Sequence, residues 1–201
     1  ILKRKYSTTK IIAITGSAGK TSLKNLINEL LKNFGKTFCS PKSYNNHYGV
    51  PLSLSMLSTN HRYGIFEVGM SKSGEIDKLS KMIKPHIGII TNVGEAHIEN
   101  FKNLKGIAKA KGEIINNIQE KGTIILNRDD RYYNYFAKRA KFKNLKIVSF
   151  GMNKKSDIFS IKIFKKGERI LLKVKFKQKV LSINIKNMNV LNALSSLALL
   201  K

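Results

Sequence analysis

The chain has 201 residues, of which 42% are hydrophobic, and its 38 basic and 12 acidic residues give a formal net charge of +26. This length is enough for one globular domain with a substantial core. No apolar run approaches the roughly 18 residues that a membrane-spanning helix needs, which excludes an integral helical membrane protein. The single cysteine, Cys39, cannot form an internal disulfide, so we expect a protein of the reducing cytoplasm.

The large positive charge would usually indicate a protein that binds nucleic acid. Only six of the 38 basic residues are arginines, and the lysines are scattered over nearly every segment. We therefore favour a solvated, lysine-rich surface and expect no nucleic-acid partner. The chain begins at Ile1 without Met and stops at Lys201 inside an expected helix, so we expect a fragment of a longer protein.

Strand-like and helix-like segments alternate through the first 150 residues. Residues 11–15 form a wholly apolar run typical of a buried parallel strand, and apolar residues then recur at helical spacing over 23–34. Further strands are expected at 63–68, 86–91, 123–127 and 146–150, with helices near 76–83, 104–118 and 131–140. This order predicts an α/β fold with a doubly wound, mostly parallel sheet.

The pattern changes after Gly151. Residues 158–164, 169–176 and 180–185 alternate apolar and polar positions, and turns are expected at 166–167 and 178–179. Such alternation is typical of antiparallel strands with one solvated face. We therefore expect a small antiparallel sheet near the C-terminal end, followed by a helix that starts at Asn189.

A glycine-containing loop, Thr-Gly-Ser-Ala-Gly-Lys-Thr-Ser at residues 15–22, joins the first strand to the first helix. Glycines let backbone N–H groups approach phosphate oxygens, and the N-terminus of a helix favours negative charge. Lys20 would reach the β- and γ-phosphates, and the Thr21 hydroxyl would bind Mg²⁺. Two residues separate Gly16 and Gly19, where the usual P-loop has four. We predict a phosphate-binding P-loop rather than a plain glycine turn.

One lysine of the helix expected at 104–118 lies on its apolar face. Ile107, Ile114 and Ile118 form the apolar stripe, and Lys111 falls on it, four positions after Ile107. Lys109 points to the opposite side. A charged side chain directed at the core is costly unless it is paired, neutralised or chemically altered. Periodicity alone favours the ordinary interpretation, in which Lys111 snorkels to the surface or forms an ion pair.

Two groups that can bind metal follow expected strands. Glu67 is a lone carboxylate within the strand at 63–68, and His97 lies in the loop after the strand at 86–91. Open α/β sheets bind ligands beyond the carboxyl ends of their strands, so both groups could hold magnesium on ATP. The alternatives are a buried, hydrogen-bonded Glu67 and a surface His97.

Together these segments resemble the middle, ATP-binding domain of the Mur ligases over essentially the whole chain. Residues 15–22 match the short phosphate loop of that family, and residues 92–97 resemble its metal-binding loop. Residues 43–51 are similar to its Asn-Asn-x-x-Gly-x-Pro segment, and residues 67–76 to its Glu-x-Gly-Met-x-x-x-Gly-Glu-Ile segment. These two segments favour the branch that adds D-alanyl-D-alanine to UDP-N-acetylmuramoyl (UDP-MurNAc)-tripeptide.

The resemblance implies roles for residues across the chain. It makes Lys20, His97 and Lys111 catalytic, and Lys111 the lysine that is carbamylated to bridge two Mg²⁺ ions held with Thr21, Glu67 and His97. It implies that ATP is bound by Gly16, Ser17, Ala18, Gly19, Lys20, Thr21, Ser22, Asn189 and Asn192, with the last two facing adenine. Met188 stands where the family has His, which departs from its pattern. Asn45 and Asn46 would line the side of the muropeptide substrate.

The resemblance further implies an ATP-dependent amide ligase of peptidoglycan synthesis, and hence of cell shape and division, that works through an acyl phosphate. Residues 1–201 would be its middle domain, truncated at the C-terminal end and lacking the N-terminal UDP-sugar domain and the C-terminal domain. Such a fragment would bind nucleotide weakly at best and would not ligate by itself, and the protein would be a monomer. The alternatives are the ligase that adds the third stem residue, a folylpolyglutamate synthase, a nucleic-acid-dependent P-loop ATPase, and a nucleotide-binding module without catalysis.

Overall fold

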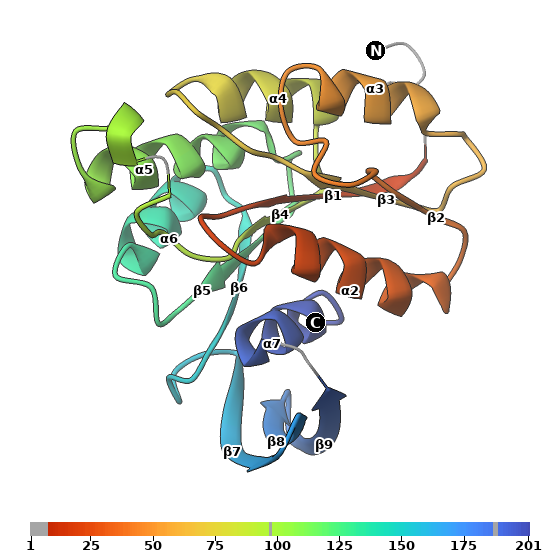
Figure 1. Ribbon diagram of the computed structural model, residues 1–201, viewed down its shortest axis with the longest axis vertical. Helices are drawn as coiled ribbons and strands as arrows, with labels where there is room; N and C mark the ends of the chain where they lie inside the picture. The colour runs from red at the N-terminus through yellow and green to blue at the C-terminus, as the bar shows by residue number, and fades with distance from the viewer. Residues whose placement is uncertain (1–7, 97, 187–188) are drawn as a thin grey trace.

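The computed structural model describes residues 8–96, 98–186 and 189–201, and its strands form one nine-stranded sheet (Figure 1). The strands are β1 (Lys10–Thr15), β2 (Thr37–Cys39), β3 (Tyr63–Glu67), β4 (Ile87–Ile90), β5 (Thr123–Asn127), β6 (Lys146–Gly151), β7 (Ile158–Lys166), β8 (Arg169–Phe176) and β9 (Lys179–Lys186). Their order across the sheet is β2-β3-β1-β4-β5-β6-β7-β8-β9.

The first six strands run parallel, as the apolar runs predict for all of them except β2. β1 lies between β3 and β4, with Ile14 opposite Glu67 and Thr15 opposite Ile90. The chain therefore adds strands first on one side of β1 and then on the other. In open α/β sheets, this change of direction opens a ligand crevice at the carboxyl end of the central strand.

Helices cover both faces of the parallel strands, which confirms the doubly wound arrangement (Figure 1). One face packs against α2 (Lys20–Lys32) and α7 (Val190–Ala198). The other packs against α3 (Gly49–Met56), α4 (Glu75–Ile83), α5 (Leu104–Lys111) and α6 (Tyr133–Phe142). Two short 3₁₀ helices, η1 (Ile98–Asn100) and η2 (Gly112–Asn117), complete the elements. No helix of the described residues is long and apolar enough to cross a membrane.

The expected antiparallel strands are present, as an extension of the parallel sheet. β7 pairs in parallel with β6 through Phe150–Ile158 and Gly151–Phe159, and then in antiparallel fashion with β8, which pairs with β9. Ile158 of β7 and Leu172 of β8 are buried in the core, whereas Ile161, Ile163 and Phe164 of β7 are exposed. The alternation of apolar and polar residues in these strands thus reflects a sheet that is covered on one face only.

The single helix expected at 104–118 is divided in two. α5 ends at Lys111, and the chain continues as the 3₁₀ helix η2 from Gly112. A Cβ atom at Gly112 would lie 3.3 Å from the Phe136 ring, so glycine permits the close approach of α6 at this point. The sequence analysis also missed β2, α3 and η1. A three-residue strand such as β2 is too short to show periodicity.

Candidate active site

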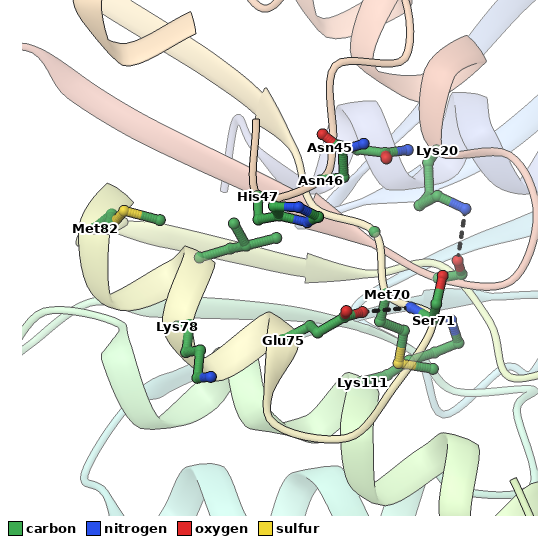
Figure 2. Close-up of a pocket in the computed structure, with 13 residues that line it drawn as sticks. Lys20, Asn45, Asn46, His47, Met70, Ser71, Glu75, Lys78, Met82 and Lys111 are labelled. Atoms are coloured by element: carbon green, nitrogen blue, oxygen red, sulfur yellow. Dashed lines mark hydrogen bonds between the residues drawn. The ribbon is translucent and has the colours of Figure 1, made fainter. Parts of the chain in front are cut away.

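A cavity of about 660 Å³ lies at the carboxyl ends of the central strands (Figure 2). Gly16 and Lys20 of the phosphate loop line one end, together with Asn45, Asn46 and Lys111. The cavity continues along α4, where Leu79 and Met82 supply apolar surface beside the charged side chains of Glu75 and Lys78. One end is therefore polar and cationic, and the side along α4 combines apolar surface with charged groups, as a site for an organic substrate requires.

The phosphate loop has a backbone shape that requires glycine. Gly16 adopts φ 151° and Gly19 φ 80°. A Cβ atom at Gly16 would lie 1.8 Å from Thr91 Oγ1, so no other residue fits there without a shift. The loop after β4 holds the phosphate loop in place, because Asn92 accepts hydrogen bonds from the N–H groups of Ser17 (3.1 Å) and Ala18 (2.9 Å).

The loop leads directly into the N-terminus of α2. Its N-cap is Gly19, its first turn contains no acidic residue, and no described side chain caps it. The first N–H groups of the helix and the positive end of its dipole are therefore available to an anion. Lys20 Nζ donates to the Gly16 carbonyl oxygen at 2.9 Å, and burial lowers the pKa of Lys20 while the Glu67 charge opposes that shift.

Glu67 ends β3 with 1% of its surface exposed, and both its carboxylate oxygens are used. Thr21 Oγ1 donates to Oε2 at 2.7 Å, and Asn45 Nδ2 donates to Oε1 at 2.7 Å. Glu67 is thus a buried, hydrogen-bonded strand residue and also a neighbour of the phosphate loop. The adjacent oxygens of Thr21 and Glu67 are hard ligands of the kind that Mg²⁺ prefers.

Lys111 is the last residue of α5 and is 2% exposed, whereas Lys109 is exposed to solvent. No described residue forms an ion pair or a hydrogen bond with its amine. Burial, and to a smaller extent the nearby Lys20 charge, lower the pKa of Lys111 to about 7. The interpretation that Lys111 snorkels to the surface is therefore wrong. Figure 2 shows that Lys111 and Lys20 approach the same end of the cavity.

The described residues contain no group of three or more His, Cys, Asp or Glu side chains that could hold a metal ion. Thr21 and Glu67 fit a hard cation, but a lysine amine does not, because it carries a proton or a single nitrogen lone pair. A Mg²⁺ site here would therefore require Lys111 to become an oxygen ligand by modification. His97 lies outside the described residues, so its assignment as a ligand stays a prediction.

The two asparagines of the last helix occupy different places. Asn189 is the N-cap of α7, and its side chain accepts a hydrogen bond from the Leu191 N–H at 2.8 Å. Asn192 is buried, and its Nδ2 donates a hydrogen bond to the Gly19 carbonyl oxygen at 3.4 Å. The start of α7 therefore lies against the phosphate loop. Contact of either side chain with adenine stays a prediction.

Two acidic residues that the sequence analysis did not select hold the site together. The Glu113 carboxylate accepts hydrogen bonds from Ser73 Oγ and from the N–H groups of Gly74 and Asp77, at 2.8–3.1 Å, and so caps α4 from η2. Asp130, after β5, accepts from the Val93 N–H at 2.7 Å. Their partners are about 40 positions away, so no local pattern indicates these roles.

The parallel sheet, the glycine loop and the bare helix N-terminus define an α/β domain of the P-loop type. The model of the Mur ligase middle domain matches residues 14–200. The chain belongs to the Mur ligase family, and the match places it in the middle domain of that family.

Individual relatives agree with this assignment. The UDP-N-acetylmuramoyl-tripeptide–D-alanyl-D-alanine ligase of Buchnera aphidicola is 39% identical over 78% of this chain and 34% of its own length. MurF of Acinetobacter baumannii superposes with a TM-score of 0.93 at 31% identity, over 98% of this chain and 44% of that one. MurF of Thermotoga maritima, solved in complex with ADP, gives 0.89 at 25% identity, over 99% and 46%. The chain therefore spans about a third to under half of the length of these relatives.

Proposed function

We propose that this chain is the ATP-binding middle domain of a ligase that joins D-alanyl-D-alanine to UDP-MurNAc-tripeptide during peptidoglycan synthesis. The relatives named above support this substrate pair. One observation carries the proposal: Lys20 of the phosphate loop, the buried Lys111 and Asn45 line one cavity, and Asn45 donates to the Glu67 carboxylate that Thr21 also contacts. These groups lie far apart in the sequence, and a fold alone does not require them to meet.

The phosphate loop would bind the ATP phosphates. Backbone N–H groups of residues 16–22 and the N-terminus of α2 would bind phosphate oxygens, and Lys20 would exchange its bond with Gly16 for one to the β- and γ-phosphates. Thr21 and Glu67, with His97 as predicted, would hold Mg²⁺. When bound, Mg²⁺ neutralises charge on the phosphates. Asn189 and Asn192 would approach the adenine end.

Lys111 would be carbamylated. An amine with a pKa of about 7 is about half neutral at neutral pH and largely neutral above it, so its nitrogen can form a bond to the carbon of CO₂ and lose a proton. The product is a carbamate anion with two oxygens, which provides the hard ligand that the unmodified lysine lacks. It would face the Thr21–Glu67 pair across the phosphate site and could bridge two cations.

The reaction would then proceed in two steps. A carboxylate oxygen of the tripeptide forms a bond to the γ-phosphorus of ATP, and ADP leaves. The amine of D-alanyl-D-alanine forms a bond to the acyl carbon, phosphate leaves, and the amine loses a proton. Asn45 and Asn46 would orient the tripeptide, whose apolar parts fit the cavity along α4. Positioning and charge stabilisation would provide most of the rate enhancement.

Two variants of the full-length ligase test this proposal. Lys20→Ala should abolish ATP turnover, and Lys111→Ala should lower kcat about 100-fold or more, because each removes charge stabilisation from the phosphate site. Short carboxylates such as acetate should partly restore Lys111→Ala. Lys109→Ala, two positions away and exposed, is the matched control and should keep normal turnover. Unchanged rates for Lys111→Ala would exclude the carbamate.

Substrate assays separate the remaining alternatives. A ligase that adds the third stem residue would consume ATP with UDP-MurNAc-dipeptide, and a folylpolyglutamate synthase would do so with folate and glutamate. A nucleic-acid-dependent ATPase would instead bind nucleic acid with a steep salt dependence. We further propose that the ligase works in the cytoplasm as a monomer, which sizing of the full-length protein tests.

A further inference from the structure

A buried lysine outside the roles described so far lies one turn beyond Thr21 on α2. Lys24 is 1% exposed and is among the largest fully buried side chains of the described residues. Burying an ammonium group is costly unless hydrogen bonds compensate the loss of water. The hydrogen bonds of the Lys24 ammonium therefore indicate its role.

The ammonium of Lys24 binds backbone carbonyls. Its Nζ donates to the carbonyl oxygen of Ser40 at 2.7 Å and to that of Lys42. Lys42 adopts a left-handed backbone conformation with φ 41°, which is uncommon for a residue with a side chain. No described carboxylate forms a salt bridge with Lys24. The side chain thus holds a strained turn that directly follows β2.

That turn leads to the residues around Glu67. Ser40 Oγ accepts a hydrogen bond from the Glu67 N–H at 3.4 Å, and the Asn45 carbonyl oxygen accepts one from the Gly69 N–H at 2.8 Å. The Asn45 side chain donates to the Glu67 carboxylate, whose other oxygen accepts from Thr21. The segment 40–45 therefore wraps around Glu67, with Lys24 at its first residues and Asn45 at its last.

We propose that Lys24 is a positioning residue: its ammonium holds the segment 40–45 so that Asn45 keeps the Glu67 carboxylate directed at Thr21. Lys24 does not itself line the cavity, whereas Asn45 does. Its effect on ligation rests on the proposed function, but its effect on the segment 40–45 does not.

Hydrogen exchange of the full-length protein tests the structural part. Lys24→Met keeps the length and the apolar stem but removes the donors, so amides of 40–47 and of Gly69 should exchange at least about tenfold faster, while those of β5 stay unchanged. Lys32→Met is the matched control, because Lys32 is an exposed residue of the same helix paired with Glu29. Unchanged exchange at 40–47, or an equal increase throughout the chain, would overturn the proposal.

Kinetics of the full-length ligase test the functional part. Lys24→Met should raise the KM for UDP-MurNAc-tripeptide about tenfold, because Asn45 lies on the muropeptide side, and should lower kcat about tenfold, because the Glu67 carboxylate is no longer held toward Thr21. The double variant Lys24→Met/Asn45→Ala should have a KM for UDP-MurNAc-tripeptide close to that of the more impaired single variant, since both changes release the same segment. Additive effects would overturn the proposal.

A second variant covers the case in which Lys24→Met does not fold. Lys24→Gln retains an N–H donor on a shorter side chain and should produce the same localised exchange pattern at lower amplitude; exchange spread evenly over the chain would overturn the proposal. If the wild type ligates none of the proposed substrates, the proposed function fails, and the exchange experiment still decides the role of Lys24.

Discussion

Gly16 and Gly74 both have positive φ, but their surroundings differ. The Cβ position at Gly16 is occupied by the Thr91 hydroxyl, whereas no heavy atom of the described residues lies within 4 Å of the Cβ position at Gly74. Backbone conformation alone therefore disfavours a side chain at Gly74. At Gly16, a side chain would also displace the phosphate loop from the end of β4.

This difference makes a matched pair of variants informative. Gly74→Ala should lower the free energy of unfolding by about 1 kcal/mol and leave nucleotide affinity unchanged. Gly16→Ala should lower it by several kcal/mol, or abolish nucleotide binding, because Thr91 and the loop must move apart. Urea unfolding and calorimetric titration with ATP measure the two quantities. Equal effects of the two variants would contradict the packing argument.

The depressed pKa of Lys111 makes stability depend on pH. The folded-state pKa is about 7 and the ordinary value is 10.5, so the unfolded chain binds more protons between these limits. The free energy of unfolding should therefore rise with pH from about 7 to about 10.5, and the penalty for charging Lys111 should be complete below that window. In Lys111→Met this contribution should disappear. Urea unfolding from about pH 6 to about pH 10 in carbonate-free buffer measures it, and parallel curves for the two proteins would contradict it.

α4 begins without a capping side chain of its own, because its N-cap is Gly74. Glu113 of η2 supplies the missing acceptor and places a negative charge at the positive end of the helix dipole. Glu113 lies two positions after Lys111, so the same contact fixes η2, and with it the end of α5, against the wall of the cavity formed by α4.

Glu113→Gln should lower the free energy of unfolding by about 1 kcal/mol, because the amide keeps one acceptor oxygen but loses the charge and the second acceptor. Glu120→Gln, at an exposed position on the same connection, should change it by less than about 0.5 kcal/mol. Urea unfolding measures both variants. A loss at Glu120 as large as that at Glu113 would show that charge alone, and not capping, matters here.

The last described helix, α7, contacts the phosphate loop, although most of the sequence separates the two. Asn192 contacts Gly19 over 173 positions, and α7 packs beside α2 on one face of the sheet (Figure 1). Leu194 of α7 is fully buried in that core. The position of the phosphate loop therefore depends on packing by residues that come last in the sequence.

Leu194→Ala should lower the free energy of unfolding by about 2–5 kcal/mol, the range for a leucine truncated in a packed core. It should also weaken nucleotide binding, because α7 carries Asn192. Leu200→Ala is the control, since Leu200 is 38% exposed and lies beyond the helix. Thermal unfolding with and without ATP measures both effects. Full nucleotide affinity in Leu194→Ala would show that α7 does not hold the loop.

Most of the parallel sheet follows from local pattern, because each buried strand is a short apolar run bounded by turns. The local sequence pattern did not predict β2 and α3, for a physical reason. β2 is held by three pairs with β3, and α3 shows little separation of polar and apolar faces, since Leu52 and Met56 are exposed. Both elements exist because of their neighbours, so their own residues indicate them only weakly.

The candidate site divides in the same way. Loop chemistry indicated Lys20 and Thr21, and helical periodicity placed Lys111 on the buried face of its helix. The burial of the Lys111 amine and its approach to the charge of Lys20, which together lower its pKa, arise only in the folded chain. Lys24 adjoins the apolar stripe of α2, and its burial depends on the turn that covers it.

Periodicity, glycine placement and apolar runs are properties of neighbouring residues, and they were sufficient to predict an α/β sheet, a phosphate loop and an inward-facing lysine. The pairing of Glu67 with Thr21 and Asn45, the capping of α4 by Glu113 and the burial of Lys24 required the folded chain. The physical reason is that hydrogen bonds and desolvation depend on distance in space, which the crossings between strands set and which local spacing does not encode.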